Sequence, residues 1–155
     1  MLKAIKRAKA HRARGRFAII ASKYNPCYVD AMLRAARKCL SDAGAEKILV
    51  VRVPGAFEIP VIAGCLARAK TPPSAIICLG VILRGATTHA QHIGEAVSNT
   101  LSQLQALHGI PIIHEVLLLE NEQQARERCL SREHNRGAEA AQTALEMASV
   151  MRNLP

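Results

Sequence analysis

The chain has 155 residues, of which 50% are hydrophobic, but only two are Phe, two are Tyr and none is Trp. This length suits one domain with a core of Ala, Ile, Leu and Val. The net charge is +9, and residues 1–16 carry seven of the Lys and Arg without any acid. No apolar stretch approaches the ~20 residues of a membrane span, and the N-terminus lacks the apolar segment of a secretory signal. We therefore expect a cytoplasmic protein with no membrane contact.

The basic N-terminal arm comprises residues 1–15, and the folded domain is expected over 16–155. A solvated, partly disordered arm is the favoured interpretation. The alternative is a patch that binds polyanions such as RNA, which would depend on phosphate neutralisation and weaken with salt. Nucleic acid is not the expected partner. The five Cys are scattered without any C-x-x-C, which argues against a disulfide framework and against zinc.

Taken in chain order, apolar runs alternate with helical patterns. Short runs rich in β-branched residues predict buried strands at 16–22, 47–53, 75–83 and 111–119. Apolar residues at helical spacing predict helices at 28–43, 60–69, 92–107, 122–128 and 137–151. This alternation predicts an α/β fold, a three-layer sandwich in which helices cover both faces of a parallel sheet.

Ligands of such sheets bind beyond the carboxyl ends of the strands. Polar and Gly- or Pro-rich segments follow the predicted strands at 23–25, 54–58, 84–89 and, less clearly, 114–120. We expect the functional residues to gather at this edge of the sheet. No P-loop or dinucleotide-binding Gly motif occurs, and no cluster of residues has metal-ligand spacing.

The segment "RGATTH" precedes a predicted helix. Thr87 or Thr88 can cap that helix, and its free N–H groups can bind an anion. Taken alone, a cap without a ligand is the commoner case. His89 can carry protons near neutral pH, but a lone His is more often structural. His92 is interpreted as a bystander on the helix face.

"VPGAFEIP" places Phe57 and Glu58 at a strand end, where Glu58 can accept from ligand hydroxyls or simply favour the helix start. Tyr24 in "SKYN" can stack on a planar ring or cap the core. Arg128 and Arg136 bracket the connection between the last two helices. They form either surface ion pairs or a grip on phosphate.

In chain order, "SKYN", "VPGAFEIP", "LGVILRGATTH", "GIPII", "ENEQQARER" and "NRGAEAAQTALEM" make residues 16–151 resemble the lumazine synthase (6,7-dimethyl-8-ribityllumazine synthase) family. The resemblance implies a flavodoxin-like, four-stranded parallel sheet flanked by helices. It implies condensation of 5-amino-6-(D-ribitylamino)uracil with 3,4-dihydroxy-2-butanone 4-phosphate, the penultimate step of riboflavin biosynthesis. No cofactor or metal is implied.

The resemblance also implies roles for single residues. His89 would be the acid–base residue, and Tyr24 would stack on the pyrimidine, where the family usually has Phe or Trp. The other implied substrate-binding residues are Asn25 in the Tyr24 loop, Ala56, Phe57 and Glu58 along the ribityl chain, Ile82 and Leu83 at the pyrimidine edge, and Ala86 and Thr87 with Arg128 around the phosphate. His114, Arg128 and Arg136 would come from the adjacent subunit.

Several positions depart from the family pattern, among them Leu119 where Thr is common, a change that we interpret as packing. His114 and Glu115 stand where Phe-Gly is usual, and Arg136 replaces a Lys. His114 could bring a second imidazole close to His89, and the changes could weaken substrate binding. The alternative is a non-catalytic flavin- or lumazine-binding or shell-forming protein on the same fold. The family forms pentamers, some closing into icosahedral shells of sixty subunits, with riboflavin synthase as a candidate partner. The resemblance also implies an N-terminal segment that joins the sheet of a neighbouring subunit, and the basic arm puts that exchange in question.

Overall fold

The computed structural model describes residues 15–155, so the expectations for the basic arm fall almost wholly outside the described residues. Four parallel strands form one sheet in the order β2-β1-β3-β4. The strands are β1 (Arg16–Ser22), β2 (Lys47–Val53), β3 (Ala75–Leu83) and β4 (Ile112–Leu119). All four predicted strands are confirmed. β4 begins one residue later than predicted, because Pro111 has no N–H to donate to a neighbouring strand.

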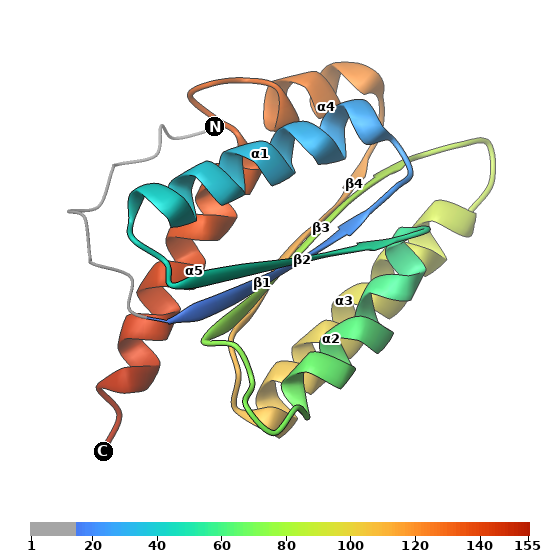
Figure 1. Ribbon diagram of the computed structural model, residues 1–155. Coiled ribbons are helices and arrows are strands. Elements are labelled where there is room, and N and C mark those ends of the chain that lie inside the picture. The colour runs from blue at the N-terminus through green and yellow to red at the C-terminus, as the bar shows by residue number, and fades with distance from the viewer. Residues whose placement is uncertain (1–14) are drawn as a thin grey trace.

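Helices cover both faces of the sheet, as Figure 1 shows. One face carries α1 (Pro26–Asp42), α4 (Glu122–Cys129) and α5 (Arg136–Arg152). The other carries a short 3-10 turn, η1 (Ala56–Glu58), with α2 (Ile59–Ala67) and α3 (His89–His108). The predicted three-layer α/β sandwich with a flavodoxin-like sheet is therefore confirmed.

The helix starts differ most from the sequence prediction. α1 begins at Pro26 rather than at residue 28, because the fixed φ of proline suits the first turn of a helix. α3 begins at His89 rather than at His92. Its first buried side chain is Ala90, and the next is Val97, so the apolar spacing marks the core-facing side of the helix and not its first residue.

The core forms two layers because alternate residues of a strand point to opposite faces of the sheet. In β1, Phe17, Ile19 and Ala21 pack under α1 and α5, whereas Ala18 and Ile20 pack under α2 and α3. Each fully buried side chain of the size of Ile or Phe stabilises the fold by about 1.5–3 kcal/mol. Aliphatic residues thus supply most of both layers, as the composition predicted.

The start of α5 lies against α1 with no room for a side chain between them. A Cβ on Gly137 would stand 2.1 Å from the carbonyl oxygen of Met32. Just before it, the buried Asn135 side chain caps α5 by accepting from the N–H groups of Gly137 and Ala138, and it donates to the carbonyl of Cys129. These contacts fix where α5 begins, and so where Arg136 stands.

Candidate active site

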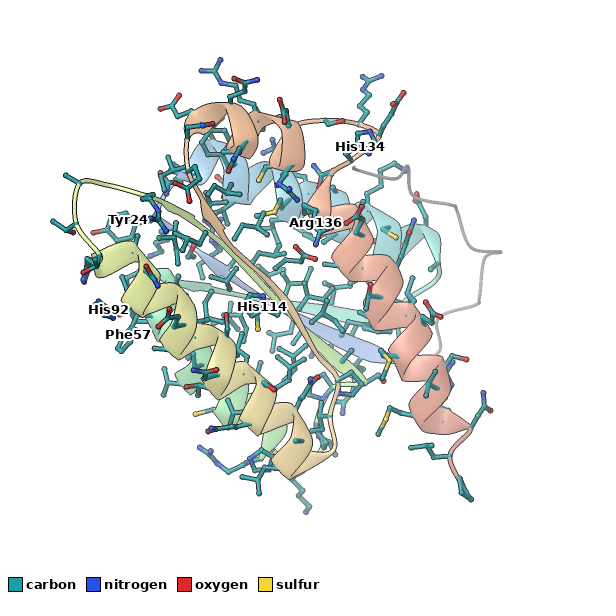
Figure 2. All side chains as sticks on the ribbon, turned by 180° about the vertical axis from the view of Figure 1, so that it is seen from behind. Tyr24, Phe57, His92, His114, His134 and Arg136 are labelled. Atoms are coloured by element: carbon teal, nitrogen blue, oxygen red, sulfur yellow. The ribbon has the colours of Figure 1, made fainter. Side chains whose placement is uncertain are left out.

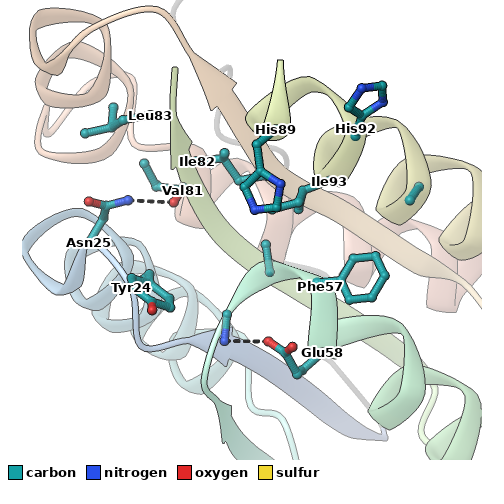
Figure 3. Close-up of a pocket in the computed structure, with 13 residues that line it drawn as sticks. Tyr24, Asn25, Phe57, Glu58, Val81, Ile82, Leu83, His89, His92 and Ile93 are labelled. Atoms are coloured by element: carbon teal, nitrogen blue, oxygen red, sulfur yellow. Dashed lines mark hydrogen bonds between the residues drawn. The ribbon is translucent and has the colours of Figure 1, made fainter. Parts of the chain in front are cut away.

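A cleft of about 800 Å³ opens at the carboxyl ends of β1, β2 and β3 (Figure 3). This is the edge at which parallel α/β sheets bind their ligands, and the volume lies in the range of small-molecule sites. The cleft is lined by Tyr24, Asn25, Gly55, Ala56, Phe57, Glu58, Val81, Ile82, Leu83, His89, His92, Ile93 and Ala96. Segments 23–25, 54–58 and 84–89 contribute as predicted, but 114–120 does not.

Asn25 joins two walls of the cleft. Its side-chain amide donates to the carbonyl oxygen of Val81 at 2.8 Å, which ties the loop after β1 to the end of β3. Its backbone lies in the left-handed region at φ 52°, a conformation that Asn tolerates better than most residues. Local strain of this kind is typical of functional sites. Asn25 thus holds the loop that presents Tyr24.

The η1 turn forms the wall after β2. A carboxylate oxygen of Glu58 accepts from the N–H of Gly55 at 2.8 Å, which leaves its other oxygen for a ligand. A Cβ on Gly55 would lie 2.9 Å from that carboxylate and 3.4 Å from the Tyr24 ring, so glycine permits their close approach. Tyr24 is 72% exposed and Phe57 61% exposed. Two aromatic rings therefore stand open at the cleft.

The third wall is the first part of α3. The His89 ring points into the cleft, whereas the His92 ring points away from Glu58 (Figure 3). His92, which the sequence pattern marks as a bystander, lines the cleft together with Ile93 and Ala96. Residues three, four and seven positions after His89 share its face of a helix. That spacing is the signal that could have found them.

Ala86 and Thr87 lie outside the lining of the cleft, on the exposed loop that joins two residues of the lining, Leu83 and His89. Thr87 Oγ1 accepts weakly from the His89 N–H at 3.4 Å, and Thr88 makes no side-chain capping bond. By contrast, asparagine side chains cap α4 and α5. The first-turn donors of α3, like those of α1 and α2, therefore lack a strong side-chain cap.

His114 lies on the α3 side of β4, away from the cleft (Figure 2). Its Nε2 stands 2.9 Å from the Ser98 hydroxyl, which itself donates to the Gly94 carbonyl. Burial lowers the pKa of His114 below its ordinary value. Ser98 is nine residues beyond His89, about 13 Å along the axis of α3. Within one chain, His114 is thus kept apart from His89.

Arg136 and Arg128 also lie outside the cleft. Arg136 donates from Nε and Nη2 to the two carboxylate oxygens of Glu115 at 3.1 and 3.0 Å, and from Nη1 to Glu139. Glu115 is only 7% exposed, and its burial raises its pKa to about 7 although Arg136 and Arg128 act in the opposite direction. Two departures from the family pattern, Glu115 and Arg136, are thus partners.

Within residues 15–155, no helix is long and apolar enough to cross a membrane. Among the same residues, His, Cys, Asp and Glu form no group of three or more that could hold a metal ion.

A parallel α/β sandwich with a histidine and a carboxylate facing one strand-end cleft is typical of α/β proteins that bind small molecules. The family model described as 6,7-dimethyl-8-ribityllumazine synthase matches residues 14–152. The chain therefore belongs to the 6,7-dimethyl-8-ribityllumazine synthase family, whose members are transferases of riboflavin biosynthesis.

Individual relatives agree with the family model. The chain is 42% identical to the 6,7-dimethyl-8-ribityllumazine synthase of Aquifex aeolicus (strain VF5) over 90% of this chain and 91% of the relative. It is 39% identical to the enzyme of that name from Xylella fastidiosa (strain M12), over 92% of this chain and 94% of the relative. The corresponding protein of Stenotrophomonas maltophilia (strain R551-3) is 37% identical over 90% and 91%.

Proposed function

We propose that the cleft binds 5-amino-6-(D-ribitylamino)uracil beside 3,4-dihydroxy-2-butanone 4-phosphate and that His89 moves protons between them. Membership of the family supports this reaction, which forms 6,7-dimethyl-8-ribityllumazine and releases phosphate and water. It favours an enzyme over a non-catalytic binding or shell-forming protein. The observation that supports the role of His89 is that its ring points into the cleft across from Glu58 (Figure 3).

The pyrimidine occupies the part of the cleft between β1 and β3. Tyr24 stacks on its ring, and the tie from Asn25 to the end of β3 keeps that loop in place. The backbone of Ile82 and Leu83 meets the polar edge of the ring. The ribityl chain extends along residues 56–58, where the free oxygen of Glu58 accepts from its hydroxyls.

The phosphate lies at the start of α3. The N–H groups of Ala86 and Thr87 donate to it, assisted by the positive end of the helix dipole. The weak side-chain capping of α3 supports an anion at this end of the helix, because the N–H groups that follow Thr88 in its first turn also have little else to bind. Arg128, half-buried in the last turn of α4, supplies the planar guanidinium that pairs well with phosphate.

Proton transfer is the main catalytic assistance that this condensation requires. The primary amine of the pyrimidine attacks the ketone and water leaves, phosphate departs by elimination, and closure of the second ring releases another water. An imidazole placed beside these atoms accelerates such steps by roughly 10²–10⁴-fold. Donors at the helix start stabilise the departing phosphate. Holding the two substrates in register supplies much of the remainder.

The active site is completed by a neighbouring subunit. His114, Arg128 and Arg136 fall outside the cleft of their own chain, which supports their contributing to the cleft of an adjacent copy. We accordingly propose a cytoplasmic pentamer, with closure into an icosahedral shell around riboflavin synthase as its larger form. Residues 16–155 form the catalytic domain, and the basic arm at 1–15 is a separate segment.

Steady-state assays with both substrates test the assignment of His89. His89→Ala should lower kcat by 10²–10⁴-fold while leaving the assembly unchanged in size-exclusion chromatography with light scattering. His92→Ala is the matched control, because it removes an imidazole from the same helix wall and should retain most turnover. Near-normal turnover of His89→Ala would refute the role of His89. The same light-scattering measurement distinguishes a pentamer from a shell.

A further inference from the structure

Glu115 is a buried carboxylate on a face of β4 that otherwise presents apolar side chains. It lies in β4 beside Leu79 of β3 and faces the layer under α5. A buried carboxylate is costly unless charged and hydrogen-bonded partners compensate for it. The charged and titratable groups that act on it are Arg136 and Glu139 of α5 and Arg128 and Cys129 of α4.

The contact between Glu115 and Arg136 is bidentate. Two guanidinium nitrogens of Arg136 donate to the two oxygens of one carboxylate, and the third nitrogen donates to Glu139. Figure 2 shows Arg136 at the first turn of α5. A forked contact of this kind fixes the plane of the guanidinium as well as its position. Arg136 is therefore held before any ligand arrives.

The same contacts decide what Arg136 can bind. An arginine has five N–H donors, and three of those of Arg136 already serve carboxylates. Above about pH 7, where Glu115 is mostly ionised, the carboxylates of Glu115 and Glu139 bring two negative charges to one guanidinium, so a phosphate placed here would meet repulsion. The two remaining N–H groups suit a neutral oxygen acceptor. Arg128, which has no such carboxylate hydrogen bond among the described residues, keeps its charge for an anion.

We propose that Glu115 is a positioning residue that holds and neutralises Arg136, so that Arg136 recognises a neutral carbonyl of the pyrimidine substrate and not the phosphate of the other. The proposal rests on the proposed function, because it takes Arg136 to face the cleft of a neighbouring subunit. Glu115 touches no substrate and acts through the guanidinium alone.

The test measures KM for each substrate separately at pH 8, together with kcat and the melting temperature. Glu115→Gln keeps the shape but loses the charge and one acceptor of the fork. We expect it to raise KM for the pyrimidine substrate about tenfold, as the loss of a charge-assisted hydrogen bond does. KM for the phosphate-bearing substrate should remain within twofold. Glu146→Gln is the matched control, because it removes an exposed carboxylate from the same helix as Arg136 and should change neither KM.

Two further measurements separate a positioning role of Glu115 from a merely structural one. In an Arg136→Ala background, Glu115→Gln should add nothing, because the group it acts through is gone. Between pH 8 and pH 6 the difference in KM between wild type and Glu115→Gln should shrink, because a protonated Glu resembles Gln and the pKa of Glu115 is about 7. A merely structural role would lower the melting temperature without either effect.

The outcomes separate the positioning role of Glu115 from the placement of Arg136 in a neighbour's active site. If Arg136→Ala raises KM for the pyrimidine and Glu115→Gln does not, the positioning role is overturned and the proposed function stands. If Glu115→Gln raises KM only for the phosphate-bearing substrate, the assignment to a neutral acceptor is overturned. If Arg136→Ala changes neither KM, the placement of Arg136 in a neighbour's active site is wrong, and the inference is wrong with it.

Discussion

Replacing Asn25 tests whether one side chain holds the cleft together. Asn25→Ala removes the hydrogen bond to the carbonyl oxygen of Val81 and leaves that part-buried oxygen without this donor. The lost bond costs about 1 kcal/mol. Alanine must also adopt the left-handed conformation at φ 52°, which costs about a further 1–2 kcal/mol. The expected loss in the free energy of unfolding is therefore about 2–3 kcal/mol.

Asn25→Gly separates the two contributions, because glycine adopts positive φ without steric cost. This variant loses the same hydrogen bond and gains some freedom in the unfolded chain, so its free energy of unfolding should fall by about 1–1.5 kcal/mol. Urea denaturation at one fixed protein concentration measures both variants, since assembly makes the apparent stability depend on concentration. Both should raise KM for the pyrimidine substrate, because the Tyr24 loop is released from β3.

The result that would refute this reasoning is equal destabilisation by alanine and glycine, which would show that the backbone conformation contributes nothing. An unchanged KM in both variants would refute the part of the argument that concerns the cleft. In that case the hydrogen bond between the Asn25 amide and β3 would serve the fold alone.

Three other predictions follow from described contacts. Gly137→Ala should lower the free energy of unfolding by several kcal/mol, because its Cβ would meet the backbone of Met32 and α1 and α5 must separate. Denaturation measures this change, and a loss below about 1 kcal/mol would contradict the prediction. Stability should fall as pH rises from about 4.5 to about 7, because burial raises the pKa of Glu115 in the folded chain; Glu115→Gln should lessen that fall in melting curves. Tyr24→Ala should raise KM for the pyrimidine about 3- to 10-fold and Tyr24→Phe hardly at all, and equal effects would exclude stacking.

The sheet and most of the cleft could be predicted from the sequence because both depend on local patterns. Continuous apolar runs mark buried parallel strands, and the strand-end rule then gathers residues such as Tyr24, Glu58 and His89 at one edge. The start of α3 was predicted three residues late, since polar residues on its exposed side hide the first turn.

The pairing of Glu115 with Arg136 could not be predicted in the same way. The two residues are 21 positions apart, and they meet only because β4 is the edge strand and α5 packs on the face toward which Glu115 points. From sequence, each was a separate departure from the family pattern. Only tertiary packing makes the two side chains partners, and no local sequence pattern encodes that pairing.

Asn135 gives the last two helices a fixed spacing. Its side chain grips the end of α4 through the carbonyl of Cys129 and the beginning of α5 through the N–H of Gly137. Arg128 directly precedes one of these anchors, and Arg136 directly follows Asn135 itself. A single uncharged amide thus fixes how far apart the chain places two cationic residues, Arg128 and Arg136.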